Sequence, residues 1–401
     1  MIFTKKQIEN YADVMIWAME NARRGGQFKK YDSVLLRYDA AAQELAAAVY
    51  AKLLQKRYNP LVRVMLPENM QRDFYAYADN KQLQFLPPAE EQFQGALNGL
   101  IALRAPQDLT ALKNTDPARI ARAAVARKPV REVLDRTEQA GQFAWTLANY
   151  PTQELAGQAG LTLKQYAAQM AKACFLNEKD PVKKWKEVMA QIADIGAWLS
   201  GLKITRLQVR SAQMDLEILL GEKRRFISGG GNNIPSFEIF TSPDWRGTRG
   251  VYYADLPSYR SGNYVRGARL EFARGRVVRA TAQEGQAFLR KMLGMDRGAA
   301  QVGEFSLTDR RFSKIDKFMA DTLFDENFGG KHGNCHLAVG ASYADTFAGD
   351  VRKLDKKAKQ TLGFNESALH WDLVNTEDKT VHAVLSGGQT VLIYEKGRFT
   401  R

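Results

Sequence analysis

Cysteine and histidine are scarce in this sequence, and their scarcity excludes several classes of protein. The 401 residues include two cysteines, Cys174 and Cys335. Two cysteines cannot build a disulfide framework and lack the spacing of a zinc knuckle, so we expect a reducing compartment. The four histidines all lie in the last quarter of the chain: His332, His336, His370 and His382. Chemistry that uses imidazole is therefore expected in the C-terminal part.

Long apolar runs are also absent. No run approaches the roughly 20 residues that cross a bilayer. The first residues, MIFTKK, lack the apolar core and cleavage site of a secretory signal. We therefore expect a soluble, cytoplasmic protein without a membrane partner. Hydrophobic residues make up 45% and charged residues 25% of the chain, which is enough for two or three domains with cores of their own.

The charge balance is basic, with 58 lysines and arginines against 44 acidic residues and a net charge of +14. Such a balance is compatible with nucleic-acid binding. The basic residues are scattered, however, and neither an RNA-binding aromatic signature nor a zinc-finger spacing is present. We expect no nucleic-acid partner. The alternative function is a basic nucleic-acid or polyanion-binding protein without catalysis, whose affinity would fall steeply with salt.

The first half of the chain alternates strand-like and helix-like segments. Strands are expected at residues 33–36, 61–66, 83–86, 97–103 and 143–147. Helical spacing covers residues 5–21, and Asp39 is expected to cap a helix that runs to about residue 56. Repeated strand–helix units predict a parallel sheet flanked by helices. No glycine fingerprint follows the first strand, so we predict no dinucleotide there.

A helical region follows, and then the spacing of the apolar residues changes from helical to strand-like. Thr152 and Thr162 are expected to begin helices, and Asp180-Pro181 to open another that ends near residue 199. From residue 203 apolar residues alternate as in strands, with helices expected at 282–293 and 312–323. We therefore predict an α/β N-terminal domain over 1–200 and an α+β, strand-rich catalytic domain over 201–401.

Two local patterns favour ordinary structural roles. The stretch Gly229-Gly230-Gly231-Asn232 lacks the Lys-Ser/Thr of a phosphate-binding loop and predicts a turn. Cys335 precedes His336, and neighbouring residues of a strand face opposite ways, so we expect Cys335 to be a small buried hydrophobe.

Four C-terminal segments carry potential metal ligands among apolar neighbours: residues 233–238, 302–305, 336–343 and 368–374. Their ligand-type residues are Glu238, Glu304, His336, His370 and Asp372. Burying unpaired carboxylates is costly, and cations remove that cost. Carboxylates with imidazoles suit Zn, Co or Mn. Five ligands exceed the three of one open catalytic zinc and suit two ions about 3.5–4 Å apart.

Each of these residues also has a simpler interpretation. His370 and Asp372 are two apart in a strand-like run and share a face, yet they could only hydrogen-bond each other. His336 alone is typical of a core histidine, and Glu304 alone could pair with an arginine such as Arg310. The metal interpretation depends on the set.

In several of these segments the sequence resembles the aminopeptidase T family of thermophilic leucyl metallopeptidases. The matching stretches are NNIPSFEIFTSP, VGEFSL, LFDENFGG, HLAVGASY and HWDLV, in the order of the family, with ACFLNEKDPVKKWKEV as a further match in the first half. The resemblance covers roughly residue 145 to the C-terminus.

The resemblance implies a homodimeric exopeptidase that removes N-terminal residues, such as leucine, from peptides by means of a metal-activated water. It implies two divalent ions (Zn, Co, Mn or Mg) held by the five ligand-type residues. It also implies that Tyr343 lies at the metal centre and donates to the oxyanion, and that Glu304 or Glu238 carries a proton to the leaving amine. A metal-binding relative without activity is a third possibility, which an assay separates.

Two departures from the family pattern bear on the site. Phe237 stands where the family has a small residue, which changes the expected shape of the pocket. The loop before HLAVG is longer and makes His332 a rival of His336, although His336 begins the matching run.

Overall fold

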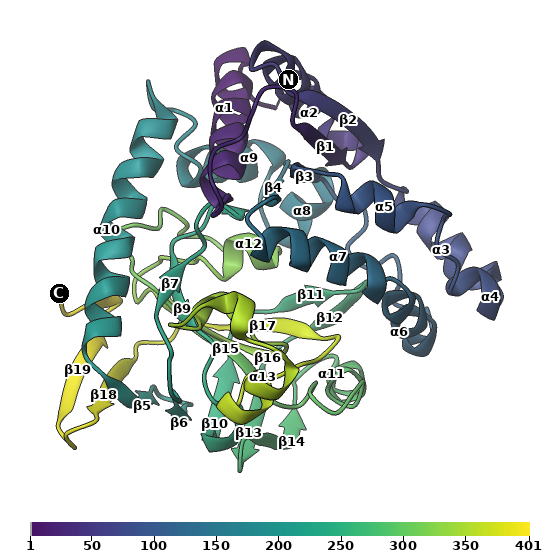
Figure 1. Ribbon diagram of the computed structural model, residues 1–401. Coiled ribbons are helices and arrows are strands. Elements are labelled where there is room, and N and C mark those ends of the chain that lie inside the picture. Colours follow the sequence, from purple (N-terminus) through teal and green to yellow (C-terminus); the bar gives the residue numbers. More distant parts are fainter. Residues whose placement is uncertain (1) are drawn as a thin grey trace. The chain divides into compact units, whose positions relative to one another are not determined.

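The computed structural model describes residues 2–401, which form two compact units (Figure 1). The first unit contains the described residues up to Lys186 together with Gly230–Ser236, and the second contains Glu187–Gly229 and Phe237–Arg401. The domain boundary that we expect near residue 200 stays a prediction for folding studies. Among the described residues, no helix combines the length and apolar character needed to cross a membrane.

The first unit is built on a five-stranded sheet in which every strand pairing is parallel. In spatial order its strands are β2 (Asn59–Val64), β1 (Ser33–Tyr38), β3 (Gly99–Arg104), β4 (Ala144–Asn149) and β8 (Asn233–Ile234). The sequence of β3 is a nearly continuous apolar run, as expected for a parallel strand covered on both faces. The α/β fold expected for this half is confirmed.

Ten helices begin in the first unit: α1 (Lys5–Ala22), α2 (Gln43–Gln55), α3 (Glu68–Tyr77), α4 (Asn80–Leu83), α5 (Glu90–Gly95), α6 (Pro117–Ala126), α7 (Lys128–Gln139), α8 (Gln153–Gln158), α9 (Leu163–Ala173) and α10 (Pro181–Gly201). The Thr4 hydroxyl accepts the Gln7 N–H at the start of α1, and the Gln7 side chain accepts the Thr4 N–H in return. This capping box fixes the helix start. Helix α1 then packs on β3 and β4.

The second unit is mostly antiparallel. Its larger sheet has the order β14 (Arg276–Thr281), β13 (Ala268–Ala273), β10 (Arg249–Ala254), β6 (Asp215–Leu219), β5 (Ile204–Arg210), β18 (Thr380–Leu385), β19 (Thr390–Glu395) and β20 (Arg398–Phe399). A smaller sheet has the order β17 (His370–Asn375), β16 (Asn334–Gly340), β15 (Val302–Thr308), β9 (Glu238–Thr241) and β7 (Ile227–Ser228). A hairpin of β11 (Ser258–Arg260) and β12 (Asn263–Val265) and the helices α11 (Gln286–Leu293), α12 (Thr322–Asp325) and α13 (Lys356–Leu362) complete the unit.

The two large sheets of the second unit pack against each other through a buried tyrosine. Tyr252 in β10 is fully buried, and its hydroxyl donates to the Leu373 carbonyl oxygen of β17 at 2.6 Å. On another side, the Phe288 ring of α11 packs on Trp371 of β17, with ring centroids 5.9 Å apart. The smaller sheet is therefore supported from behind, which positions the side chains on its other face.

Two sequence expectations for secondary structure are wrong. Residues 83–86 form no strand, because Asp79 and Gln82 make a capping box that begins the short helix α4. Residues 312–323 form no long helix, and only α12 is helical there. The Asp325 carboxylate accepts the N–H groups of Met319 and Asp321, so side-chain acceptors replace the helical hydrogen bonds of this segment.

Asp39 also has a different role from the one expected. Its carboxylate accepts the Ala105 N–H at 2.7 Å and makes no cap hydrogen bond to the following turn. A 3-10 turn, Ala40–Ala42, comes next, and α2 begins only at Gln43. The helix starts expected at Thr152 and Thr162 and the helix opened by Pro181 are confirmed.

Gly231 is required by a close backbone approach. Its φ is +116°, and a Cβ atom there would lie 2.4 Å from the Ala18 carbonyl oxygen of α1. Gly26 has the same φ but open space around it. We therefore expect Gly231→Ala to reduce the free energy of unfolding by about 1–3 kcal/mol more than Gly26→Ala does. Urea denaturation of both variants checks this, and equal losses would contradict the steric argument.

Candidate metal centre

Five ligand-type side chains lie on four neighbouring strands of the smaller sheet. Glu238 begins β9, Glu304 lies in β15, His336 in β16, and His370 and Asp372 in β17. These strands are hydrogen-bonded in the order β17-β16-β15-β9. Segments far apart in the sequence are thus brought side by side by strand pairing.

The register of β15 places three of the five on one face. Glu304, Ser306 and Thr308 alternate along β15 and share a face. Thr308 pairs directly with Glu238, and Ser306 pairs directly with His336. Residues directly opposite each other in an antiparallel pair point to the same side of the sheet. Glu238 and His336 therefore lie on the face of Glu304.

The register of β16 adds the other two. Ala338 pairs with Glu304 on one side and with Asp372 on the other, so the two acids flank a small side chain in one row. His370 lies two residues before Asp372 and shares its face, as the sequence spacing predicts. The small methyl group of Ala338 leaves space between the acids.

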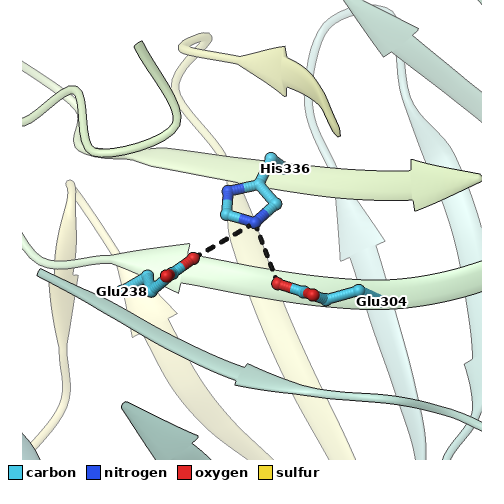
Figure 2. Close-up of side chains that lie close together, drawn as sticks. All are labelled: Glu238, Glu304 and His336. Carbon is cyan, nitrogen blue, oxygen red and sulfur yellow. Dashed lines mark hydrogen bonds and ion pairs between the residues drawn. The ribbon is translucent and has the colours of Figure 1, made fainter. Parts of the chain in front are cut away.

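The side chains converge in two groups that share one glutamate. His336 Nε2 lies 3.1 Å from Glu304 Oε1 and 3.4 Å from Glu238 Oε2. Figure 2 shows the imidazole of His336 directed at both carboxylates. His370 Nε2 lies 3.3 Å from Asp372 Oδ1 and 3.7 Å from Glu304 Oε2. Within each group the ligand atoms lie within 4.8 Å of one another. Each oxygen of Glu304 faces a different histidine.

The donor atoms are oriented for a common target. His370 Nδ1 lies 2.8 Å from the Ala341 carbonyl oxygen, which can only accept, so Nδ1 carries the proton and Nε2 is directed at the acids. An imidazole held in this way at its second nitrogen is typical of metal ligands. His336 also directs Nε2 at the acids, while its Nδ1 has no hydrogen-bond partner.

The electrostatics of the cluster call for positive charge. Burial alone would lower the pKa of His336, but the hydrogen bond with Glu304 and the charge of Glu238 raise it to about 9. Burial likewise opposes the charged form of His370, whose pKa the nearby Asp372 raises to about 9. Burial would raise the pKa of Asp372, but His370 holds it well below its usual range. Buried acids of this density fit divalent cations, which supply the positive charge that they need.

The sequence interpretation missed one acid, Glu326. It follows α12, only 6% of it is exposed, and burial, together with the charges of Glu238, Asp372 and Glu304, raises the pKa of its carboxyl. Glu326 therefore belongs to the same charge cluster. Its signal was present in the stretch LFDENFGG, but no strand pattern there indicated which way it points.

Phe237, which departs from the family pattern, is fully buried. Its N–H donates to the side-chain oxygen of Asn327, the neighbour of Glu326, at 2.5 Å. Residues of the LFDENFGG stretch thus support the chain immediately before Glu238.

Tyr343 lies against His370, with ring centroids 4.7 Å apart, and against Phe240 at 5.8 Å. Its residue surface is 43% exposed, so the ring borders the cluster at an accessible point. Crowding by protein atoms, followed by the charges of Glu304 and Asp372, keeps the pKa of its hydroxyl well above the usual range. The hydroxyl therefore stays protonated near neutral pH and can donate a hydrogen bond.

The rival histidine lies elsewhere. His332 pairs with Asp378 at 3.3 Å and is absent from both donor groups, whereas His336 is central to one. His382 belongs to β18 of the larger sheet. Cys335 is fully buried, as expected for a small hydrophobe.

A buried cluster of carboxylates and imidazoles on one sheet face is the donor set of a metal-dependent hydrolase. The comparisons with known proteins agree with this class. The sequence profile of the thermophilic metalloprotease family (M29) matches residues 4–399. The chain belongs to this family.

Related proteins are similar over most of their length. Aminopeptidase PepS of Streptococcus thermophilus is 24% identical over 415 residues, which cover 98% of each chain. Aminopeptidase T of Thermus thermophilus is 28% identical over 312 residues, 73% of this chain and 74% of the relative. The solved structure of wild-type AmpT from Thermus thermophilus superimposes with a TM-score of 0.78 at 22% identity, covering 98% of this chain and all of the other, and it confirms the fold.

The geometry predicts different metal-binding effects for two histidines. Replacing His336 with alanine removes a donor at the centre of one group, so we expect the affinity for Zn or Co to fall by about 10–100-fold. His332→Ala is the matched control and should retain the wild-type metal content, because His332 faces Asp378. Elemental analysis after equilibrium dialysis compares the two. Equal metal contents in both variants would show that His336 is not a ligand.

Proposed function

We propose that this M29 metallo-aminopeptidase removes N-terminal residues from peptides at a centre of two divalent ions. Glu238, Glu304 and His336 would hold one ion, and Glu304, His370 and Asp372 the other. The proposal depends on one observation: the two carboxylate oxygens of Glu304 face different donor groups. Glu304 would thus be the bridging ligand.

When bound, the ions supply Lewis acidity, which polarises a carbonyl and activates water. The side chains around them organise the rest of the reaction. Tyr343, protonated and accessible beside His370, donates a hydrogen bond to the oxyanion that forms at the scissile carbonyl. Glu304, the sequence-predicted proton carrier, would have both oxygens engaged as the bridging ligand, so Glu326, buried in the same cluster, is the better candidate for carrying the proton to the leaving amine.

Removal of only the first residue requires recognition of a free amine. Asp372 is the most accessible of the acidic ligands, with 14% of its side chain exposed against 7% for Glu238 and 4% for Glu304. A carboxylate at the accessible side favours the positive N-terminus of a peptide over an internal amide. Peptides with hydrophobic N-terminal residues such as leucine are the proposed substrates, as the family resemblance of the sequence implies.

The activity test uses leucine-p-nitroanilide. We expect hydrolysis by the metal-loaded protein, loss of the rate in EDTA and recovery with Co or Zn. N-acetyl-leucine-p-nitroanilide should be resistant, because it lacks the free amine. A rate that survives complete chelation would refute the metal mechanism.

Glu304→Gln keeps the size of the bridging residue but removes its charge. We expect kcat to fall by at least about 100-fold, since both donor groups lose a ligand. Glu366→Gln is the control, because Glu366 is half exposed and pairs only with Lys359. Comparable losses in the two variants would contradict the bridging role of Glu304.

We also propose that the chain forms a homodimer through the free edge of the first sheet. Strand β2 is the edge strand, and it exposes Val62 and Val64 by 51% and 52%. Exposed apolar residues on an unpaired strand favour association. Two copies related by a two-fold axis would pair their β2 edges antiparallel, which makes this surface complementary to itself.

If two chains associate through β2, disrupting this strand should lower the molecular mass of the protein in solution. Val62→Lys with Val64→Lys should reduce the mass measured by light scattering from a dimer to the 45.1 kDa of one chain. Val278→Lys in β14, an edge strand with a comparably exposed valine, should remain dimeric. A dimer that persists in the β2 variant would place the interface elsewhere.

A further inference from the structure

An arginine that the mechanism does not use lies beside the metal centre. Arg260 ends β11, in the hairpin formed with β12, and pairs with Asn263. The hairpin is fastened to β17, because the Trp371 indole N–H donates to the Ser258 hydroxyl at 2.9 Å. Trp371 stands between His370 and Asp372, so this contact brings the hairpin to the strand that carries two of the proposed ligands (Figure 1).

Arg260 lies over an aromatic ring of β17, the edge strand of the smaller sheet. Its guanidinium carbon lies 5.6 Å from the centroid of the Trp371 ring. Burial lowers the pKa of Arg260 to about 10, while the charges of Asp372 and Tyr343 act to raise it. The guanidinium is therefore charged at neutral pH and close enough to Asp372 to interact with its charge.

The Nε of this guanidinium is buried and has no hydrogen-bond partner among the described residues. A buried charged donor without an acceptor is costly. An acceptor brought by a ligand would remove this cost. The edge formed by Nε and the adjacent nitrogen of an arginine matches the two oxygens of a carboxylate.

A short substrate carries such a group close to the scissile bond. Tyr343 and Asp372 would flank the scissile carbonyl in the proposed reaction, and successive residues of a peptide are about 3.8 Å apart. One residue beyond the scissile bond, a dipeptide carries its C-terminal carboxylate. A longer or capped peptide carries only a neutral carbonyl there, which binds arginine more weakly.

Resting on the proposed aminopeptidase function, we infer that Arg260 is a specificity residue that binds the free C-terminal carboxylate of dipeptides. Dipeptides are then the preferred substrate class. The preference arises from an ionic contact outside the metal centre and acts mainly on KM.

The test compares Leu-Gly with Leu-Gly amide, which differ only in the charge of the terminal group. For the metal-loaded wild-type protein we expect kcat/KM to be about tenfold or more higher for Leu-Gly, as a charge-assisted contact provides. In Arg260→Gln this ratio should fall to about 1, through KM for Leu-Gly. Arg260→Lys keeps the charge without the planar fork and should give an intermediate ratio.

Arg266→Gln is the matched control, because Arg266 lies on the same hairpin segment but pairs with Glu284 at the surface. It should keep the wild-type ratio. Circular dichroism and metal content of each variant separate a local effect from misfolding. A variant that loses metal would make Arg260 a support of Asp372 and overturn the inference.

The remaining outcomes are also decisive. Equal rates on the two substrates with the wild-type protein, or an unchanged ratio in Arg260→Gln, refute the role of Arg260 and leave the proposed function intact. Failure of the metal-loaded wild-type protein to hydrolyse either substrate refutes the proposed function, and the inference about Arg260 with it.

Discussion

Buried carboxylates on one face of the smaller sheet are the constraint on which the rest of the site depends. Glu238 and Glu304 are 5% and 3% exposed, and Asp372 and Glu326 complete the set. Carboxylates that are this close together repel one another, and their burial removes the water that would hydrate their charges. Imidazoles alone compensate only by taking up protons, as the raised pKa of His336 reflects. Divalent cations compensate more completely, so binding metal and stabilising this face are the same physical event.

Strand register is what brings these groups together. Shifting β16 by one residue would turn His336 to the opposite face and bring Cys335 to the acids, since the side-chain period of a strand is two. The register is held from behind by Tyr252, whose hydroxyl donates to the Leu373 carbonyl oxygen of the adjacent strand. A buried hydrogen bond between the two sheets thus supports the geometry of a polar site on the other side. The function of the site is therefore inseparable from the packing of the second unit.

Local patterns allowed some of this to be predicted from the sequence, and non-local pairing explains the rest. The two-residue spacing of His370 and Asp372 predicts a shared face, because strand geometry alone determines it. Convergence of Glu238 and Glu304 with them rested on the set of ligand types and on family resemblance, since no local rule gives the strand order. Glu326 was not predicted as part of the cluster, because its segment is irregular and its apolar residues show no helical or strand periodicity. The same irregularity, stabilised by the Asp325 carboxylate, made the predicted helix over 312–323 wrong.

Substrate selection follows from the parts of this site that remain accessible. Phe237 was expected to reshape the pocket, but it is fully buried and its backbone is held by Asn327. An aromatic ring there supports the start of β9 and does not present itself to a peptide. Tyr343 is accessible beside His370, and Arg260 places a buried Nε, which has no hydrogen-bond partner among the described residues, beside β17. The proposed chemistry thus belongs to the enclosed strand face with Tyr343 at its edge, and the proposed discrimination between peptides belongs to Arg260.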